Sequence, residues 1–213
     1  KLDEITYDEM LELSTLGAGV LHNRSVEMAK KYGVQLVVRS SLNTNEGTIV
    51  REEVNMEKML VSGVAVDKNA TRIAVVGLKD EPGVAFHLFN ALAKYNINVD
   101  VILQSIGRDG TKDISFTVAE DVADEAVSII QKSFPKSDYK KIDEEKDVAK
   151  LSIVGAGMMS NPGVAASMFE ALYDCGVNIK MISTSEIRVT VLIDQKYVER
   201  AINAVHDKFS LAD

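Results

Sequence analysis

A repeat with a spacing of 80 residues constrains this 213-residue chain more than any other feature. Pro82-Gly83-Val84-Ala85 recurs as Pro162-Gly163-Val164-Ala165. Further identical pairs keep the same spacing: Phe89 and Phe169, Ala91-Leu92 and Ala171-Leu172, Asn98 and Asn178, and Ser105 and Ser185. Upstream, Val75-Val76-Gly77 matches Ile153-Val154-Gly155 at a spacing of 78, so the second copy has two additional residues before its proline. The chain therefore contains two copies of one module.

Both copies show the same order of helical and extended periodicity. Apolar residues at i, i+3, i+4 and i+7 predict a first helix, with Ala85, Leu88, Phe89 and Leu92 in one copy and Ala165, Met168, Phe169 and Leu172 in the other. Short β-rich runs follow at 99–103 and 179–182, and alternation of period two then predicts strands marked by Ile114, Phe116 and Val118, and by Ile187, Val189, Val191 and Ile193. A second helix is predicted by the stripes Val122, Ala126, Ile129 and Ile130, and Val198, Ala201, Ile202, Val205 and Phe209. Gly107-Arg108-Asp109-Gly110 is expected to form a turn between strands.

Each copy thus predicts strand, helix, strand, strand and helix, and needs one further strand to complete an α+β fold with helices on one face. The first copy can finish at 139–142, whereas only 211–213 follow the last helix of the second. We expect the β-rich run 61–66 to supply the missing strand, which inserts the first module in the second. The charged residues 143–147 are expected to form a solvated connection between the modules, and an acidic docking site is the alternative.

Residues 1–51 lie outside the repeat. Thr6 and Glu9 have the spacing of a capping box, which predicts a helix start. A second helix is expected from about Leu21 to Tyr32, ending at Gly33, and 35–39 is typical of a strand. Because these elements are too few to bury a core of their own, we expect the segment to complete another domain or to pack on the repeats.

Charge and composition disfavour several classes of function. The net charge is −8 and there is no basic run, which argues against nucleic acid and anionic membranes as partners. A single cysteine, Cys175, cannot form an internal disulfide and fits a reducing compartment. His22, His87 and His206 lack the spacing of metal ligands. His87 and His206 lie on predicted helices and are expected to be ordinary surface or packing residues. The chain has no apolar stretch of about 18 residues, and its polar first residues are not a signal peptide. Since it lacks an initial Met, we expect it to be part of a longer protein.

Several ordered blocks resemble the aspartokinase family. Residues 5–13, 17–22, 38–41 and 47–49 are similar to the end of its catalytic domain, and 154–158, 178–179 and 182–188 are similar to the second of its two regulatory ACT domains. The resemblance implies tandem ferredoxin-like ACT domains (βαββαβ), with a kinase remnant at 1–55, a first ACT domain at 71–148 and a second at 61–70 and 149–213. Asn23 stands where the family usually has proline, which puts only that helix start in doubt.

Aspartokinases transfer the γ-phosphate of ATP to the side-chain carboxylate of aspartate, the first step of lysine, threonine and methionine biosynthesis. The family's Lys-Phe-Gly-Gly motif for ATP is absent from this sequence. The resemblance therefore implies a cytoplasmic allosteric region with no catalytic residue and no cofactor of its own, inactive by itself, while ATP and Mg²⁺ belong to a kinase lobe of the same or a partner chain. It also implies feedback inhibition by lysine, threonine or both, and a homodimer paired through the ACT domains.

An amino-acid effector needs donors for its carboxylate, acceptors for its ammonium group and a pocket for its side chain. The turn Asp80-Glu81-Pro82-Gly83 leads into a helix, whose first amides, on Val84 and Ala85, favour a carboxylate. Asp80 can accept from an ammonium group, and Gln104 can donate and accept. By resemblance, one side of the effector pockets is formed by Asp80, Gly83, Ala85, Asn98, Val99, Asp100 and Gln104, and the other by Val164, Ala165, Asn178, Ile179, Ser185 and Glu186. Ala165 lies where relatives often carry a hydroxyl group, which predicts a weaker or empty second pocket.

Other interpretations of these residues remain. A Pro-Gly pair also serves simply to start a helix, and Asn98 and Asn178 also suit a turn before a strand, although their recurrence favours ligand contact. The run 155–160 begins like a dinucleotide fingerprint but places Ser160 at the sixth position. A free amino-acid-binding module that serves another partner is the second hypothesis for the whole chain, and a small complete enzyme is the third.

Overall fold

The structure of the chain is a computed structural model. It describes residues 1–54, 60–105 and 109–211, apart from the side chain of Met159. Three sequence predictions therefore reach outside the described residues: the expected turn, at Gly107 and Arg108, the end of the first segment, at residue 55, and the stretch after the last helix, at 212–213. The described chain forms two compact units, one of 68–149 and one of 1–67 together with 150–213.

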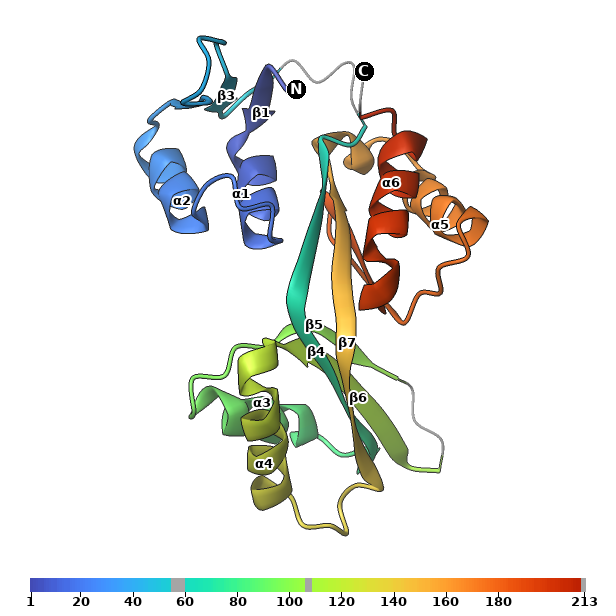
Figure 1. Cartoon of the computed structure of the whole chain (residues 1–213). Helices are drawn as coiled ribbons and strands as arrows, with labels where there is room; N and C mark the ends of the chain where they lie inside the picture. The colour runs from blue at the N-terminus through green and yellow to red at the C-terminus, as the bar shows by residue number, and fades with distance from the viewer. Residues whose placement is uncertain (55–59, 106–108, 212–213) are drawn as a thin grey trace. The chain divides into compact units, whose positions relative to one another are not determined.

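The unit of 68–149 is a four-stranded sheet covered on one face by two helices. Its strand order is β5 (Asp100–Gln104), β6 (Thr111–Val118), β4 (Gly63–Lys79) and β7 (Lys141–Val154). Strands β4 and β5 are both antiparallel to β6. The helices α3 (Val84–Ala93) and α4 (Ala123–Ser133), the latter preceded by the short helix η1 (Glu120–Val122), lie side by side on the sheet (Figure 1).

The core of this unit follows the predicted periodicity. Ile114, Phe116 and Val118 of β6 are buried, as are Leu88 and Leu92 of α3. The remaining stripe residues predicted for α3, Ala85 and Phe89, are partly buried and pack against this core. The ring of Phe89 meets that of Phe116 edge-on, with 5.4 Å between centroids, a favoured aromatic geometry.

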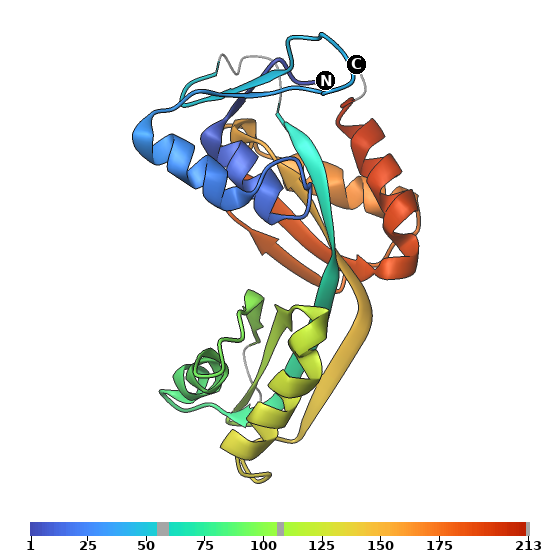
Figure 2. The same cartoon turned by 60° about the vertical axis from the view of Figure 1, so that its left-hand side comes forward.

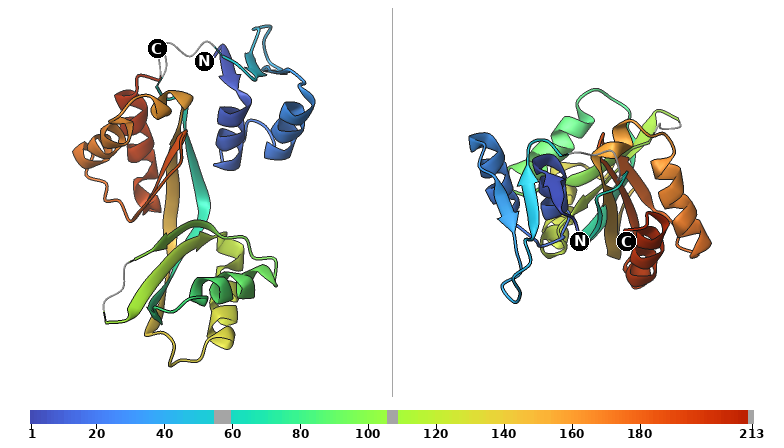
Figure 3. Two further views of the ribbon diagram at one scale, coloured as in Figure 1. Left: turned by 180° about the vertical axis from the view of Figure 1, so that it is seen from behind. Right: turned by 90° about the horizontal axis from the view of Figure 1, so that it is seen from above.

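The strands of the second unit have the order β4, β7, β9 (Arg188–Asp194) and β8 (Met181–Thr184). β4 contributes its beginning to this unit, and β7 contributes its end. The backbone amide of Ser62 donates to the carbonyl oxygen of Val154 at 2.7 Å, so the run at 61–66 does lie beside the second module, as predicted. Figure 3 shows α5 (Val164–Asp174) and α6 (Val198–Lys208) together on one side of these strands. Two short helices, η2 (Ala156–Met159) and η3 (Gln195–Tyr197), precede them. The duplicated α+β module predicted from the repeat is confirmed.

The N-terminal segment contains β1 (Glu4–Thr6), α1 (Tyr7–Thr15), α2 (Asn23–Tyr32), β2 (Leu36–Val38) and β3 (Thr48–Arg51). The capping box of Thr6 and Glu9 is confirmed, and Gly33 ends α2 in the left-handed conformation, with φ of 62°. Figure 2 shows α1 and α2 side by side. The three-stranded sheet, of order β1-β3-β2, was only partly predicted: the strand at 35–39 was expected, whereas β1 and β3 were not, because they are stabilised by pairing between distant segments, as of Glu4 with Ile49. The segment shares a hydrophobic cluster with Ala65 and Val154, so it packs on the second module.

Residues 143–147 were expected to form a solvated connection between the modules. The prediction of a connection is wrong, because these residues are part of the strand β7. Their charges are compatible with a strand since most of the side chains remain partly or fully exposed and several form ion pairs. Arg72 contacts Glu145 at 3.4 Å, and Lys146 contacts Asp124 at 2.8 Å. A run of charge is therefore accommodated by an extended backbone whose side chains alternate between two faces.

Candidate effector sites

The predicted effector turn of the first module precedes α3. Gly83 is the N-cap residue of α3 and has φ of 94°, a left-handed conformation that costs an L-residue with a side chain about 1–2 kcal/mol. The amide of Asp80 donates to the carbonyl oxygen of Gly110 at 2.9 Å, and the amide of His87 donates to that of Gly83 at 2.9 Å. The turn is thus fixed at both ends by backbone hydrogen bonds.

The carboxylate of Asp80, predicted to accept an ammonium group, already has a cationic partner. Lys112 on β6 places its Nζ 3.0 Å from Oδ1 of Asp80. The side chain of Lys112 is only 11% exposed, whereas that of Asp80 is 56% exposed. Sequence reasoning missed Lys112, because its proximity depends on the register in which β6 pairs with β4, where Lys112 lies opposite Leu78.

The structure divides the first predicted set between two ends of the sheet. Gln104, the last residue of β5, pairs with Ile114 in the middle of β6. Asp80 follows Lys79, which pairs with Thr111 at the start of β6. Asp100 pairs with Thr117 at the other end of β6, and Asn98 and Val99 directly precede it in the chain. The first predicted set is therefore divided between the two ends of the sheet. Toward one end lie Asp80, Gly83, Ala85 and Gln104, and toward the other lie Asn98, Val99 and Asp100.

Asp100 is followed by an unusual backbone conformation. Val101 has φ of 41°, which is rare for a β-branched residue, and it lies where the pairing of β5 with β6 shifts register. The amide of Val101 donates to Oδ1 of Asp100 at 2.9 Å, and Oγ1 of Thr117 donates to the carbonyl oxygen of Asp100 at 3.0 Å. One carboxylate oxygen of Asp100 thus serves the bulge itself.

The second predicted set is spread over three places: Val164 and Ala165 begin α5, Asn178 and Ile179 lie between the end of α5 and the start of β8, and Ser185 and Glu186 lie in the turn between β8 and β9. Gly163 is the N-cap residue of α5, with φ of 100°, and repeats the conformation of Gly83. The side chain of Val164 is buried, and the side chains of Ala165 and Ile179 are partly buried. Asn178, Ser185 and Glu186 are exposed.

A pocket of 530 Å³ in the second unit contains two of these predicted residues. Ser185 and Glu186 contribute to it from the turn between β8 and β9, together with Ala156 and Ile187. The opposite wall is formed by three residues of the N-terminal segment, Thr6, Asp8 and Glu52. The contribution of the N-terminal segment had no signal in the sequence, because 100 or more positions separate the two walls.

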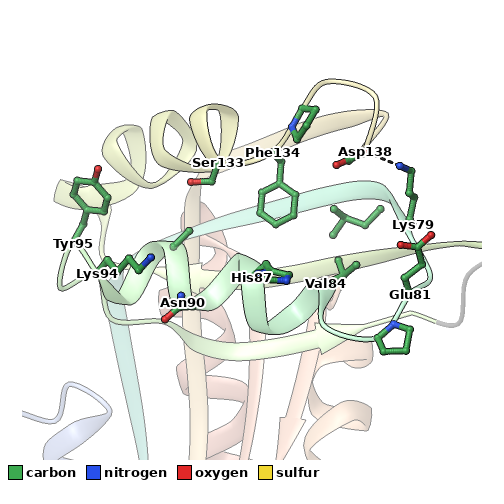
Figure 4. Close-up of a pocket in the computed structure, with 14 residues that line it drawn as sticks. Lys79, Glu81, Val84, His87, Asn90, Lys94, Tyr95, Ser133, Phe134 and Asp138 are labelled. Atoms are coloured by element: carbon green, nitrogen blue, oxygen red, sulfur yellow. Dashed lines mark hydrogen bonds and ion pairs between the residues drawn. The ribbon is translucent and has the colours of Figure 1, made fainter.

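A larger groove of 660 Å³ lies between α3 and the end of α4 (Figure 4). It includes Glu81, Pro82 and Val84 of the predicted turn region, and His87, which was expected to be an ordinary surface or packing residue. At its rim, Lys79 donates to Asp138 at 2.7 Å. This hydrogen bond lowers the pKa of Asp138 and raises the pKa of Lys79 relative to their ordinary values.

The part of the chain that the structure describes contains neither a candidate metal cluster nor a candidate membrane-spanning helix. Across 1–54, 60–105 and 109–211, no group of three or more His, Cys, Asp or Glu side chains is arranged to hold a metal ion. None of the helices within these ranges is long and apolar enough to cross a membrane.

The fold and the repeated helix-start turns define a protein with two ACT domains, and the ACT domain family matches 73–134 and 151–209. The chain is 48% identical to the aspartokinase of Helicobacter pylori over 216 residues, covering 99% of this chain and 53% of that protein. The aspartate kinase of Synechocystis has a TM-score of 0.70 at 41% identity, covering 98% of this chain and 38% of that one. The ligand-free regulatory subunit of aspartate kinase from Thermus thermophilus has a TM-score of 0.66 at 40% identity, covering 70% of this chain and 99% of that one.

This chain belongs to the aspartokinase family, and it corresponds to the regulatory type of region found there. It spans about half the length of the curated relatives that it matches.

Proposed function

We propose that this chain is the feedback-sensing region of an aspartate kinase, which binds lysine, threonine or both and thereby inhibits the phosphorylation of aspartate by a kinase lobe. The observation that carries this proposal is the duplicated turn: Gly83 and Gly163 have nearly the same left-handed φ, each directly before a helix. Helix N-termini present unpaired amides and a positive dipole, which suit the carboxylate of a free amino acid.

The ammonium group of the effector is assigned to Asp80 in the first module. An incoming ammonium group competes there with Lys112, which is already 3.0 Å from the carboxylate. Gln104 lies toward the same end of the sheet and supplies one donor and one acceptor. In the second module, Ser185 and Glu186 supply the corresponding hydroxyl and carboxylate groups beside a pocket.

The N-terminal segment is assigned to the kinase domain. Its surface retains large exposed apolar side chains although it already packs on the second module, which favours a further domain as its missing partner. These side chains are Val20, Met28, Tyr32, Val34, Val37 and Leu42, of which Leu42 is 94% exposed. The Thermus thermophilus regulatory subunit covers 70% of this chain, in keeping with a boundary between a sensor and a kinase remnant.

A homodimer through the ACT domains is the proposed assembly. In the described sheet, β5 and β8 are the outermost strands. They carry Ile102 and Ile182, which are equivalent in the repeat and are 52% and 41% exposed. Outer strands offer unpaired backbone groups that a second copy can pair.

Isothermal titration calorimetry of the purified chain with lysine and with threonine tests the proposal. We expect at least one of them to bind, and Asp80→Ala and Gln104→Ala to weaken that binding. Unchanged affinity in both variants would overturn the assignment of the first site. A stand-alone sensor without a kinase partner remains the alternative, and it would be favoured if the reading frame upstream encoded no kinase lobe.

A further inference from the structure

The side chain of Glu9 makes more contacts than a helix cap requires. Its Oε2 accepts from the amide of Thr6 at 3.1 Å and from the hydroxyl of Thr6 at 2.8 Å, which completes the capping box. Its Oε1 accepts from Oγ of Ser62 at 2.5 Å and from the amide of Ala156 at 3.0 Å. The side chain is 1% exposed. One oxygen therefore caps α1, and the other holds the second module.

Both distant donors lie on backbone that is itself held closely. Ser62 pairs with Val154 through its amide, at the place where β4 begins beside the end of β7. Ala156 follows Gly155, whose amide donates to the carbonyl oxygen of Ile187 at 2.9 Å. A methyl group added at Gly155 would lie 2.3 Å from the carbonyl oxygen of Leu60. The Ala156 amide is thus fixed relative to Ile187, the neighbour of the predicted effector residue Glu186.

A second contact lies one helical turn further along α1. Glu12 accepts from Nη1 of Arg188 at 3.0 Å, and the two side chains are 27% and 21% exposed. The carbonyl oxygen of Arg188 accepts from the amide of Ser185 at 2.8 Å. Residues i and i+3 share one face of a helix, so Glu9 and Glu12 present the same face of α1 to the loop at Ala156 and to the turn between β8 and β9.

These contacts adjoin the pocket of 530 Å³ to which Ala156, Ser185 and Glu186 contribute. A ligand that orders Ser185 and Glu186 acts on a turn that leads directly into Arg188, the first residue of β9, which binds Glu12. The same ligand lies beside the amide that binds Glu9. Because closely packed contacts have few alternative arrangements, a change at the turn reaches α1 through these two carboxylates.

We propose that Glu9, supported by the Glu12–Arg188 pair, couples occupancy of the second effector site to the stability of α1 and so of the N-terminal segment. The coupling rests on the proposed function, since it requires an amino acid at Ser185 and Glu186. Coupling of this kind is reciprocal, so ordering of α1 also raises affinity for the effector.

Hydrogen exchange of the 213-residue chain, followed by mass spectrometry with and without saturating threonine or lysine, tests the coupling. In the unaltered chain, we expect the effector to slow exchange in the turn 183–188 and, at least threefold, in α1. In Glu9→Gln, the turn is still protected, whereas the effect on α1 falls to less than half. Glu4→Gln removes an ion pair with Arg51 inside the N-terminal segment and should retain the full response.

The possible outcomes separate the two proposals. If neither amino acid binds, the proposed function fails and the coupling fails with it. If an amino acid binds and α1 does not respond, or if the turn is not protected, the coupling alone is overturned. If the effector protects α1 equally in Glu9→Gln and in the unaltered chain, Glu9 does not carry the coupling and the proposal is overturned. If Glu9→Gln does not fold, Glu12→Gln serves as the second variant, and a full α1 response in it would overturn the proposal.

Discussion

Gly83 and Gly163 lie 80 positions apart and adopt the same left-handed backbone, with φ of 94° and 100°. Each is the N-cap residue of the first helix of its module. Neither helix has a side-chain hydrogen bond at its N-cap, although Ser, Thr, Asp and Asn are the usual choices there. The two modules thus use glycine where a capping side chain is usual, so no side chain at the N-cap accepts from the first amides of either helix. In the first module the amide of Val84 instead donates to the carbonyl oxygen of Glu81 at 3.5 Å.

Replacing Gly163 by alanine tests the conformational role of this glycine. No atom lies within 4 Å of the added methyl group, so the cost arises from the backbone alone and should be about 1–2 kcal/mol of unfolding free energy. Urea unfolding measures it. Gly155→Ala is the contrast, because its φ of 177° suits any residue while its methyl group would meet Leu60. We expect the larger loss there, and an unaffected Gly163→Ala variant would contradict the conformational argument.

The aromatic pair of the first module gives a second prediction. Phe116 is fully buried, and its truncation in Phe116→Ala should cost about 3–5 kcal/mol. Phe86, which is 64% exposed on α3, is the matched control, and Phe86→Ala should change stability by no more than about 0.5 kcal/mol. Chemical denaturation of both variants decides the matter, and similar losses would place the core of this unit elsewhere.

The ion pair between Lys79 and Asp138 predicts a pH dependence. The hydrogen bond from Lys79 holds the pKa of Asp138 below its ordinary value of 3.8, and the same bond holds the pKa of Lys79 above 10.5. When folding lowers the pKa of a carboxyl group, the folded state is stabilised at every pH above the pKa that the group has in the unfolded chain. This stabilisation is lost as the pH falls through the pKa that the group has in the folded chain. A raised lysine pKa gives stability that is present below pH 10.5 and is lost above it.

Titration of Asp138 by nuclear magnetic resonance should therefore give a midpoint below 3.8. Lys79→Gln should raise this midpoint, because Lys79 is the largest cause of the lowered pKa of Asp138. Because the pair is exposed, added salt should reduce the shift as well. A midpoint that Lys79→Gln leaves unchanged would show that the pair does not persist in solution.

The Lys112–Asp80 pair predicts a variant with tighter effector binding. An ammonium group that binds Asp80 must displace Lys112. Because the Asp80 side chain is 56% exposed, solvent keeps the worth of this pair to about 1 kcal/mol. Lys112→Met removes the competitor, so affinity should rise by up to about fivefold. Calorimetry against the unaltered chain measures the change. Weaker binding would instead show that Lys112 contacts the carboxylate of the effector.

The outer strands predict a change in assembly. Charges on outer strands block pairing with another chain, so Ile102→Lys together with Ile182→Lys should convert the proposed homodimer to a monomer. Light scattering after gel filtration reports the mass. Val34→Lys, on an exposed apolar residue of the N-terminal segment, is the control and should leave the mass unchanged. A chain that is monomeric before any substitution would refute the proposed assembly.

Sequence periodicity predicted the local features of the fold. The spacing of Thr6 and Glu9 identified the start of α1, and Gly33 identified the end of α2. Both were predictable because helix capping depends on residues that are neighbours in the sequence. The same Thr6–Glu9 motif gave no indication that Glu9 also binds Ser62 and Ala156. Those partners are 53 and 147 positions away, and only the folded chain brings them together.

The prediction for 143–147 shows how tertiary context overrides composition. Five consecutive charges suggested a solvated connection, yet pairing in the sheet and partners such as Arg72 keep them in β7. For the candidate site, the glycine turns were predictable because they recur. Lys112 was not, since its approach to Asp80 depends on strand register, and neither was the division of the first set between two ends of the sheet.

Thermal unfolding of the purified chain with each proteinogenic amino acid tests the central claim most directly. A ligand at about 100 times its Kd stabilises the folded state by about 2.7 kcal/mol. We predict a rise in Tm with lysine, threonine or both, and no rise with amino acids that do not fit the site. A Tm that no amino acid raises, even at millimolar concentration, would contradict the account of this chain as an amino-acid sensor.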